Sequence, residues 1–127
     1  MTKLIVALAL ASSLSAPSVA QLANPILGVW RQDDGAVTVR IAQCASGTNH
    51  CAIVIDEKLQ LGEPSRLGKV TVKDIRPAGS MRWTGVFVDQ GTTLGAKIRQ
   101  LSPTAMTFKI CALAFLCETK RLQRVSR

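Results

Sequence analysis

Turn signals recur about every ten residues from Trp30 onward, and this spacing constrains the fold more than any other feature of the chain. Each signal combines Gly, Pro, Asn, Asp or Ser, the residues that tight turns favour because of their backbone freedom or their local hydrogen bonds. The predicted turns lie at residues 33–35, 46–49, 77–80, 90–91 and 102–103. The segments between them are too short for typical helices and suit short strands.

Apolar and polar residues alternate between these turns. Val37, Val39 and Ile41 share one face of an extended chain, whereas Thr38 and Arg40 share the other, the pattern of a half-buried strand. Residues 83–88 are apolar or small on both faces, which predicts a buried strand. The expected strands start near residue 28 and cover 37–41, 52–55, 70–76, 83–88, 94–99, 106–110 and 116–125. Seven or eight such strands and no amphipathic helix predict an all-β sandwich or a barrel.

The N-terminus has the features of a secretory signal peptide. Lys3 precedes the apolar run of residues 4–11, and residues 18–20 are small where a signal peptidase cuts. A transmembrane anchor is the alternative, but it needs about 20 apolar residues; this run is too short, and Ser and Pro follow at its far end. We therefore expect cleavage near Ala20, a single domain over residues 21–127 with no transmembrane segment, and a periplasmic or secreted location.

Four cysteines lie within the expected mature chain, namely Cys44, Cys51, Cys111 and Cys117. An even number in a short secreted chain predicts disulfides, and four cysteines allow three pairings. We favour Cys44–Cys51 and Cys111–Cys117, because each pair brackets a predicted hairpin turn. A zinc site is the alternative, but the spacings do not match the usual Cys-x-x-Cys knuckles.

The order of several short motifs resembles a known family. Residues 28–30 (Gly-Val-Trp) open the first strand, residues 83–85 (Trp-Thr-Gly) open a later one, and Arg124-Val125 closes the last; the cysteines lie between. This order is similar to a widespread family of small secreted bacterial proteins catalogued as a domain of unknown function. The resemblance spans residues 28–125 and implies an antiparallel eight-stranded lipocalin-like (calycin) barrel.

In calycins, a tryptophan on the first strand packs beside an arginine on the last. The resemblance therefore implies structural roles for Gly28, Trp30, Trp83 and Arg124, with Arg124 over the Trp30 ring and Arg121 as the second candidate. The chain also departs from the family: residues 56–64 only loosely match an Asp/Asn/Pro-rich segment, and leucines replace a tyrosine at 94 and a tryptophan at 122. A ligand site formed by those positions in the family would be altered here.

Candidate catalytic residues are sparse. His50 is the only histidine, and no partner nucleophile is evident. Asp33-Asp34 precedes a glycine as in an ordinary turn, and Asp56 and Glu57 point to opposite faces of a strand. We therefore expect no catalytic, cofactor or metal site and no enzymatic activity.

The charge balance bears on the partner. The net charge is +8, but only 4% of residues are aromatic, so base-stacking platforms are hard to build and a nucleic-acid partner is not expected. A solvated basic surface is one interpretation, and attraction to an anionic envelope component is the other.

An apolar run separates the last two cysteines at residues 112–116, where a turn is normally polar. In the favoured interpretation, Leu113 and Phe115 fold inward and plug one end of the barrel. In the alternative, Leu113, Phe115 and Leu116 form an exposed contact tip for a partner or a membrane.

The sequence alone thus favours a binding protein, for a small apolar ligand or an envelope component. A periplasmic protease or lysozyme inhibitor and a structural or stress-related envelope protein are the alternatives.

Overall fold

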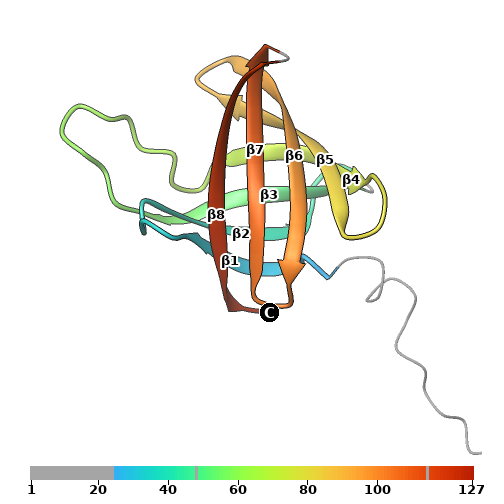
Figure 1. The fold of residues 1–127 in the computed structure, drawn as a ribbon. Helices are drawn as coiled ribbons and strands as arrows, with labels where there is room; N and C mark the ends of the chain where they lie inside the picture. Colours follow the sequence, from blue (N-terminus) through green and yellow to red (C-terminus); the bar gives the residue numbers. More distant parts are fainter. Residues whose placement is uncertain (1–24, 48, 114) are drawn as a thin grey trace, which may run out of the picture.

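Eight antiparallel strands form a closed barrel in the computed structural model, which describes residues 25–47, 49–113 and 115–127 (Figure 1). Each strand pairs with the next along the chain, and β8 pairs with β1 to close the barrel. The strands are β1 (Gly28–Gln32), β2 (Val37–Gln43), β3 (His50–Glu57), β4 (Val70–Pro77), β5 (Arg82–Asp89), β6 (Thr92–Ser102), β7 (Ala105–Leu113) and β8 (Leu116–Ser126). The barrel prediction is confirmed; the expected signal peptide lies outside the described residues.

Tight turns join most of the strands where the sequence places Gly, Pro and Asp. Gly35 and Gly91 take positive φ values of 74° and 80° at the β1–β2 and β5–β6 turns, a region that glycine enters without steric cost. The long exception is the β3–β4 loop, residues 58–69, which projects from the barrel body (Figure 1). Within the described ranges, no helix is long and apolar enough to span a bilayer.

Side chains fill one half of the barrel interior. Trp30 is fully buried, and its indole Nε1 donates a hydrogen bond of 2.8 Å to the Ile26 carbonyl. Ile26, Ile75 and Trp83 pack into the same core. The half that contains the start of β1 and the end of β8 is therefore closed.

Arg124 covers this closed end. Its guanidinium carbon lies 4.4 Å from the centre of the Trp30 ring. The same group donates to the carbonyl oxygens of Leu27, at 2.7 Å, of Pro103, at 2.8 Å, and of Pro25. The Trp30–Arg124 contact predicted from the resemblance is thus present in the fold, and it is Arg124 rather than Arg121 that makes it.

Gly28 is required by the same contact. It has a φ of 126°, and a Cβ there would lie 2.5 Å from the Ser126 carbonyl oxygen and 2.9 Å from Arg124 Nη1. Both approaches are closer than real Cβ contacts, so a larger residue would displace the strand end or the arginine.

Both predicted disulfides are present. Cys44–Cys51 joins the ends of β2 and β3, and Cys111–Cys117 links directly opposite positions of β7 and β8. The prediction of a buried β5 is only partly right, because Trp83 is buried but residues 84–89 are half-buried. Thr84 and Val86 face outward, and Phe87 faces a cavity.

Candidate functional site

The barrel is hollow at the end opposite Trp30. A cavity of about 770 Å³ opens between the β1–β2 turn, the β3–β4 loop, the end of β5 and the β7–β8 hairpin. Its floor is the upper surface of the packed core. The floor residues are nearly inaccessible to solvent and comprise Val39, Ile41, Ala52, Val72, Ile98, Met106 and Leu122. Their low exposure shows that the cavity narrows towards the core.

Half-buried apolar side chains form the cavity wall. Phe87 on β5 pairs with Leu94 on β6, so these two side chains share the inner face. Phe108 on β7 lies with its ring centre 6.2 Å from that of Phe87, and Ile110 continues the same face towards the opening. The site is thus an apolar funnel with an aromatic pair in its wall.

Charged side chains surround the mouth. Arg66 on the β3–β4 loop makes a bidentate ion pair with Asp89 at the end of β5, at 3.0 and 3.2 Å. Glu57 at the end of β3 accepts hydrogen bonds from the Ser65 hydroxyl and, at 3.0 Å, from the Arg66 backbone N–H. These bonds, that from Ser65 foremost, lower the pKa of Glu57. They also fasten the C-terminal end of the loop to the rim.

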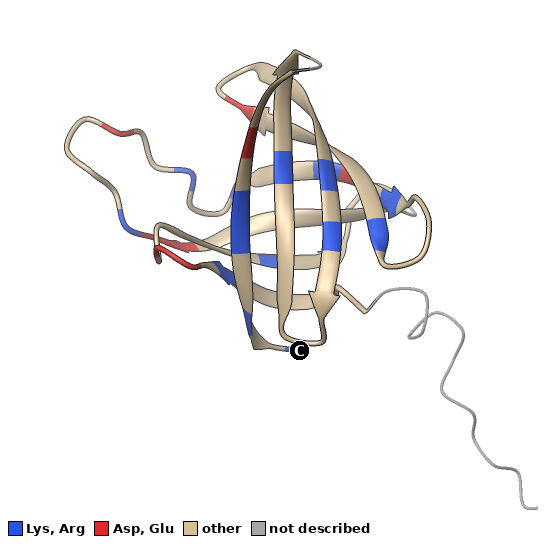
Figure 2. Cartoon of the chain, in the orientation of Figure 1, with Lys and Arg blue, Asp and Glu red and all other residues tan. Residues whose placement is uncertain are grey.

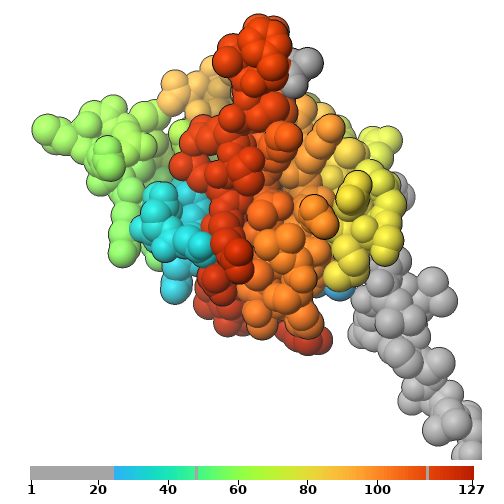
Figure 3. Space-filling model, viewed as in Figure 1, coloured from blue at the N-terminus to red at the C-terminus, as the bar shows by residue number. Residues whose placement is uncertain are grey.

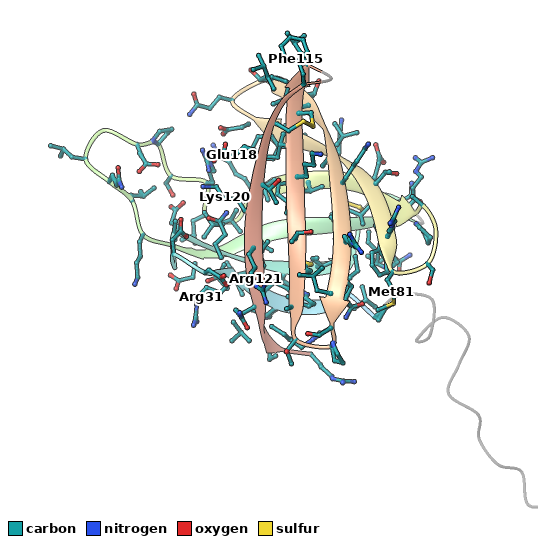
Figure 4. All side chains as sticks on the ribbon, viewed as in Figure 1. Arg31, Met81, Phe115, Glu118, Lys120 and Arg121 are labelled. Carbon is teal, nitrogen blue, oxygen red and sulfur yellow. A yellow bond between two sulfur atoms is a disulfide. The ribbon has the colours of Figure 1, made fainter. Side chains whose placement is uncertain are left out.

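β8 brings a second ion pair to the mouth. Its inner face carries Glu118 and Lys120, which are opposite Ile110 and Phe108 on β7. Lys120 Nζ lies 2.9 Å from Glu118 Oε1, and this hydrogen bond raises the pKa of Lys120. In Figure 4 both side chains lie below Phe115 along the same hairpin. The inner wall is therefore apolar on β5–β7 and polar on β8.

The predicted plug at residues 112–116 is wrong. Leu113, Phe115 and Leu116 are 57%, 78% and 55% exposed. The disulfide lies where the two strands are still extended, so the hairpin continues past the rim instead of folding over it (Figure 3). Phe115 and Leu116 border the cavity mouth, and the seal of the barrel is at the other end, under Arg124.

Several of the remaining predicted site residues support the fold away from the cavity, although Cys117 of the second disulfide borders it. Gly28, Trp30 and Arg124 form the closed end, and Trp83 packs in the core, with no hydrogen-bond partner for its indole N–H among the described residues. His50 lies on β3, opposite Gln43 of β2, and does not border the cavity. The described residues contain no cluster of three His, Cys, Asp or Glu side chains suited to a metal ion.

Sequence analysis named parts of the cavity lining without assembling them: Leu94, Leu122 and much of residues 56–64, where the chain departs from the family, line the cavity, whereas the inner face of β8 and the Arg66–Asp89 pair were missed. The signal for β8 was present, because the period of two places Leu116, Glu118, Lys120, Leu122 and Arg124 on one face. The net charge, which counts all basic residues together, does not show this alternation. No comparable signal exists for Arg66, whose partner Asp89 is 23 residues away and is brought near only by the barrel.

Comparisons with known proteins found no relative of this chain. No family model matches the chain, and no curated protein or solved structure matches it either. The barrel architecture that the family resemblance implies is present, whereas membership of that family stays a prediction.

Proposed function

We propose that this protein is a non-enzymatic barrel that binds a small apolar or amphiphilic molecule in its cavity. The observation that carries the proposal is the funnel itself. It is apolar at its floor and on the β5–β7 side of its wall, carries charged groups on β8 and at its mouth, and has a volume of about 770 Å³. Pockets for small molecules typically measure about 300–1,000 Å³ and combine an apolar lining with a few polar groups.

The arrangement favours a ligand with an apolar body and a polar end. Burial of the body against Phe87, Phe108 and Ile98 supplies the affinity, because each buried CH₂ contributes about 0.8 kcal/mol. The polar end would remain at the rim beside Lys120 and Arg66, where water also has access. The carboxylates there accept hydrogen bonds or ion pairs, an arrangement that supports orientation of a ligand more than general acid–base chemistry.

A secreted or periplasmic location belongs to the same proposal. Two disulfides in a chain of this size favour an oxidising compartment. A barrel that carries an apolar molecule through an aqueous compartment would need a closed floor and one opening, as found here.

A cavity-filling variant tests the proposal. Leu94→Trp places an indole in the funnel opposite Phe87, and Leu101→Trp places the same indole at an exposed position of the same strand as a control. With the neutral fluorescent probe N-phenyl-1-naphthylamine, we expect Leu94→Trp to weaken binding at least about tenfold and Leu101→Trp to leave it unchanged. No probe binding by the native protein, or equal binding by all three proteins, would contradict the proposal.

Inhibition of a secreted protease or lysozyme is the second candidate, favoured by the β3–β4 loop. This loop projects beyond the barrel (Figure 3), and Leu61 within it is fully exposed. A stable stoichiometric complex with a protease or lysozyme, lost in Leu61→Ser but retained in Leu94→Trp, would support this alternative over ligand binding.

A further inference from the structure

The outer wall of the barrel concentrates positive charge on β5–β7. Arg82 on β5 is directly opposite Arg99 on β6, and Lys97 on β6 is directly opposite Lys109 on β7. All four side chains are exposed. Side chains at directly opposite positions have Cβ atoms about 4.5–5.5 Å apart, and like charges placed so destabilise a sheet. Two adjacent like-charge pairs thus oppose the stability of the fold.

Among the residues that the structure describes, no acidic side chain forms a salt bridge with these four cations. The salt bridges found in the described ranges join other pairs, namely Arg66–Asp89, Lys120–Glu118 and Arg121–Asp33. Five of the eight acidic residues instead line the cavity mouth. In Figure 2 blue segments lie on β5, β6 and β7, whereas the red segments lie mainly at the β1–β2 turn, in the projecting loop and near the ends of β3 and β5.

The cations surround a hollow. A depression of about 440 Å³ lies on this wall, and its lining includes Arg82, Lys97, Arg99 and Lys109 together with the hydroxyl-bearing Thr107 and Thr119. These side chains supply hydrogen-bond donors as well as charge, the combination that phosphate oxygens accept. The wall is therefore complementary to an anionic, phosphate-bearing surface.

A group of apolar side chains lies at the end of the β7–β8 hairpin, further along β7 than Lys109. Leu113, Phe115 and Leu116 are exposed at the end of β7 and β8, past the Cys111–Cys117 disulfide (Figure 4). A soluble polyanion offers no apolar phase for these side chains. A phospholipid bilayer offers both an anionic headgroup layer and an acyl region, and proteins bind its surface through basic and apolar groups together.

We propose that the basic wall of β5–β7 and the exposed β7–β8 hairpin end form a docking surface for an anionic phospholipid bilayer. The four cations contact headgroup phosphates, and Phe115 inserts at the interface. None of the four cations borders the barrel cavity, whereas Phe115 lies at its mouth, so substitution of the cations tests docking separately from ligand binding in the cavity.

Vesicle sedimentation tests the docking surface. The native protein should bind vesicles of phosphatidylglycerol mixed with phosphatidylcholine, should not bind phosphatidylcholine alone, and should dissociate as salt is raised. Lys97→Gln with Lys109→Gln should weaken binding about 25-fold, since each basic residue near an anionic surface accounts for about fivefold. Phe115→Ser should weaken it about tenfold.

The matched control removes two charges elsewhere. Arg40, exposed on β2, and Lys69, exposed before β4, lie outside the docking surface. Arg40→Gln with Lys69→Gln should change vesicle binding by less than about twofold, and thermal unfolding confirms that each variant is folded. Equal weakening by both double variants would mean attraction to net charge and would overturn the proposal. Failure of the native protein to bind the anionic vesicles would also overturn the proposal. So would a result in which soluble polyphosphate binds as tightly as the vesicles and Phe115→Ser binds the vesicles as tightly as the native protein does.

Discussion

Arg124 stabilises the closed end of the barrel in two ways. Its guanidinium covers the Trp30 ring, and its N–H groups satisfy the carbonyl oxygens of three residues that β-sheet pairing leaves free. Partial burial lowers the pKa of Arg124, because desolvation disfavours its charged form. Removal of the side chain would therefore leave carbonyl groups unpaired as well as expose the indole.

The first prediction concerns this pair. Trp30→Ala should lower the free energy of unfolding by about 3–5 kcal/mol because it empties the core. Arg124→Ala should lower it by about 1–3 kcal/mol because three carbonyl groups, two of them half-buried, lose their donor. The double variant should lose less than the sum, since contacting residues couple. Urea unfolding measures all three, with exposed Arg121→Ala as the control, and strict additivity would rule out the coupling.

Glu57 provides a pH-dependent contact at the mouth. Its pKa is below the usual value of 4.5, first because of the Ser65 hydroxyl and then because of the Arg66 N–H. A carboxyl group with a lowered pKa stabilises the fold above its unfolded pKa, and that contribution is lost as the pH falls through its folded pKa. The attachment of the loop to the rim should therefore weaken only in acid, below about pH 4.5.

The second prediction follows from the cause of this shift. Ser65→Ala removes the main hydrogen bond and should raise the pKa of Glu57 towards 4.5. The amide proton shift of Arg66, followed by NMR as the pH is lowered, reports the titration directly. An unchanged midpoint in Ser65→Ala would show that the Ser65 hydroxyl does not hold the carboxylate.

At the scale of elements, the β7–β8 hairpin combines a disulfide, one cavity wall and an exposed end. The disulfide closes a short loop, so by the chain-entropy relation it should contribute about 2 kcal/mol to the free energy of unfolding.

The third prediction is that Cys111→Ser with Cys117→Ser lowers the free energy of unfolding by about 2 kcal/mol and leaves the Cys44–Cys51 link intact. Denaturation with and without reductant checks it. No difference between the variant and the native protein would contradict it.

The exposed end of the hairpin leads to a fourth prediction. Phe115→Ser should leave the midpoint of thermal unfolding close to that of the native protein, because the ring is 78% exposed. A large decrease would restore the interpretation that Phe115 seals the barrel.

The elements were largely predictable because their signals are local. Turn residues and the period of two located the strands, and hairpin spacing paired the cysteines. The orientation of the β7–β8 end was not predictable, because the apolar residues 112–116 suit a plug and an exposed tip equally well. Only the position of the disulfide, on strands that extend past the rim, decides between them.

At the scale of the whole molecule, the interior could not be predicted either. Alternation shows which residues face inward, but not whether side chains from opposite strands meet across the barrel. Two tryptophans pack in the closed half, whereas the half-buried Phe87 and Phe108 line the other half, which stays hollow. The charge separation between the mouth and the outer wall arises in the same way, from residues distant in sequence.

NMR of methyl groups tests the ligand-binding cavity most directly. The native protein is titrated with a single-chain alkyl amphiphile below its micellar concentration. Binding in the funnel predicts saturable shifts at the methyl groups of Ile98, Met106 and Leu122, with Leu101 and Val125 on the outside unaffected. Shifts confined to outer methyl groups, or none at any concentration, would contradict a ligand-binding barrel.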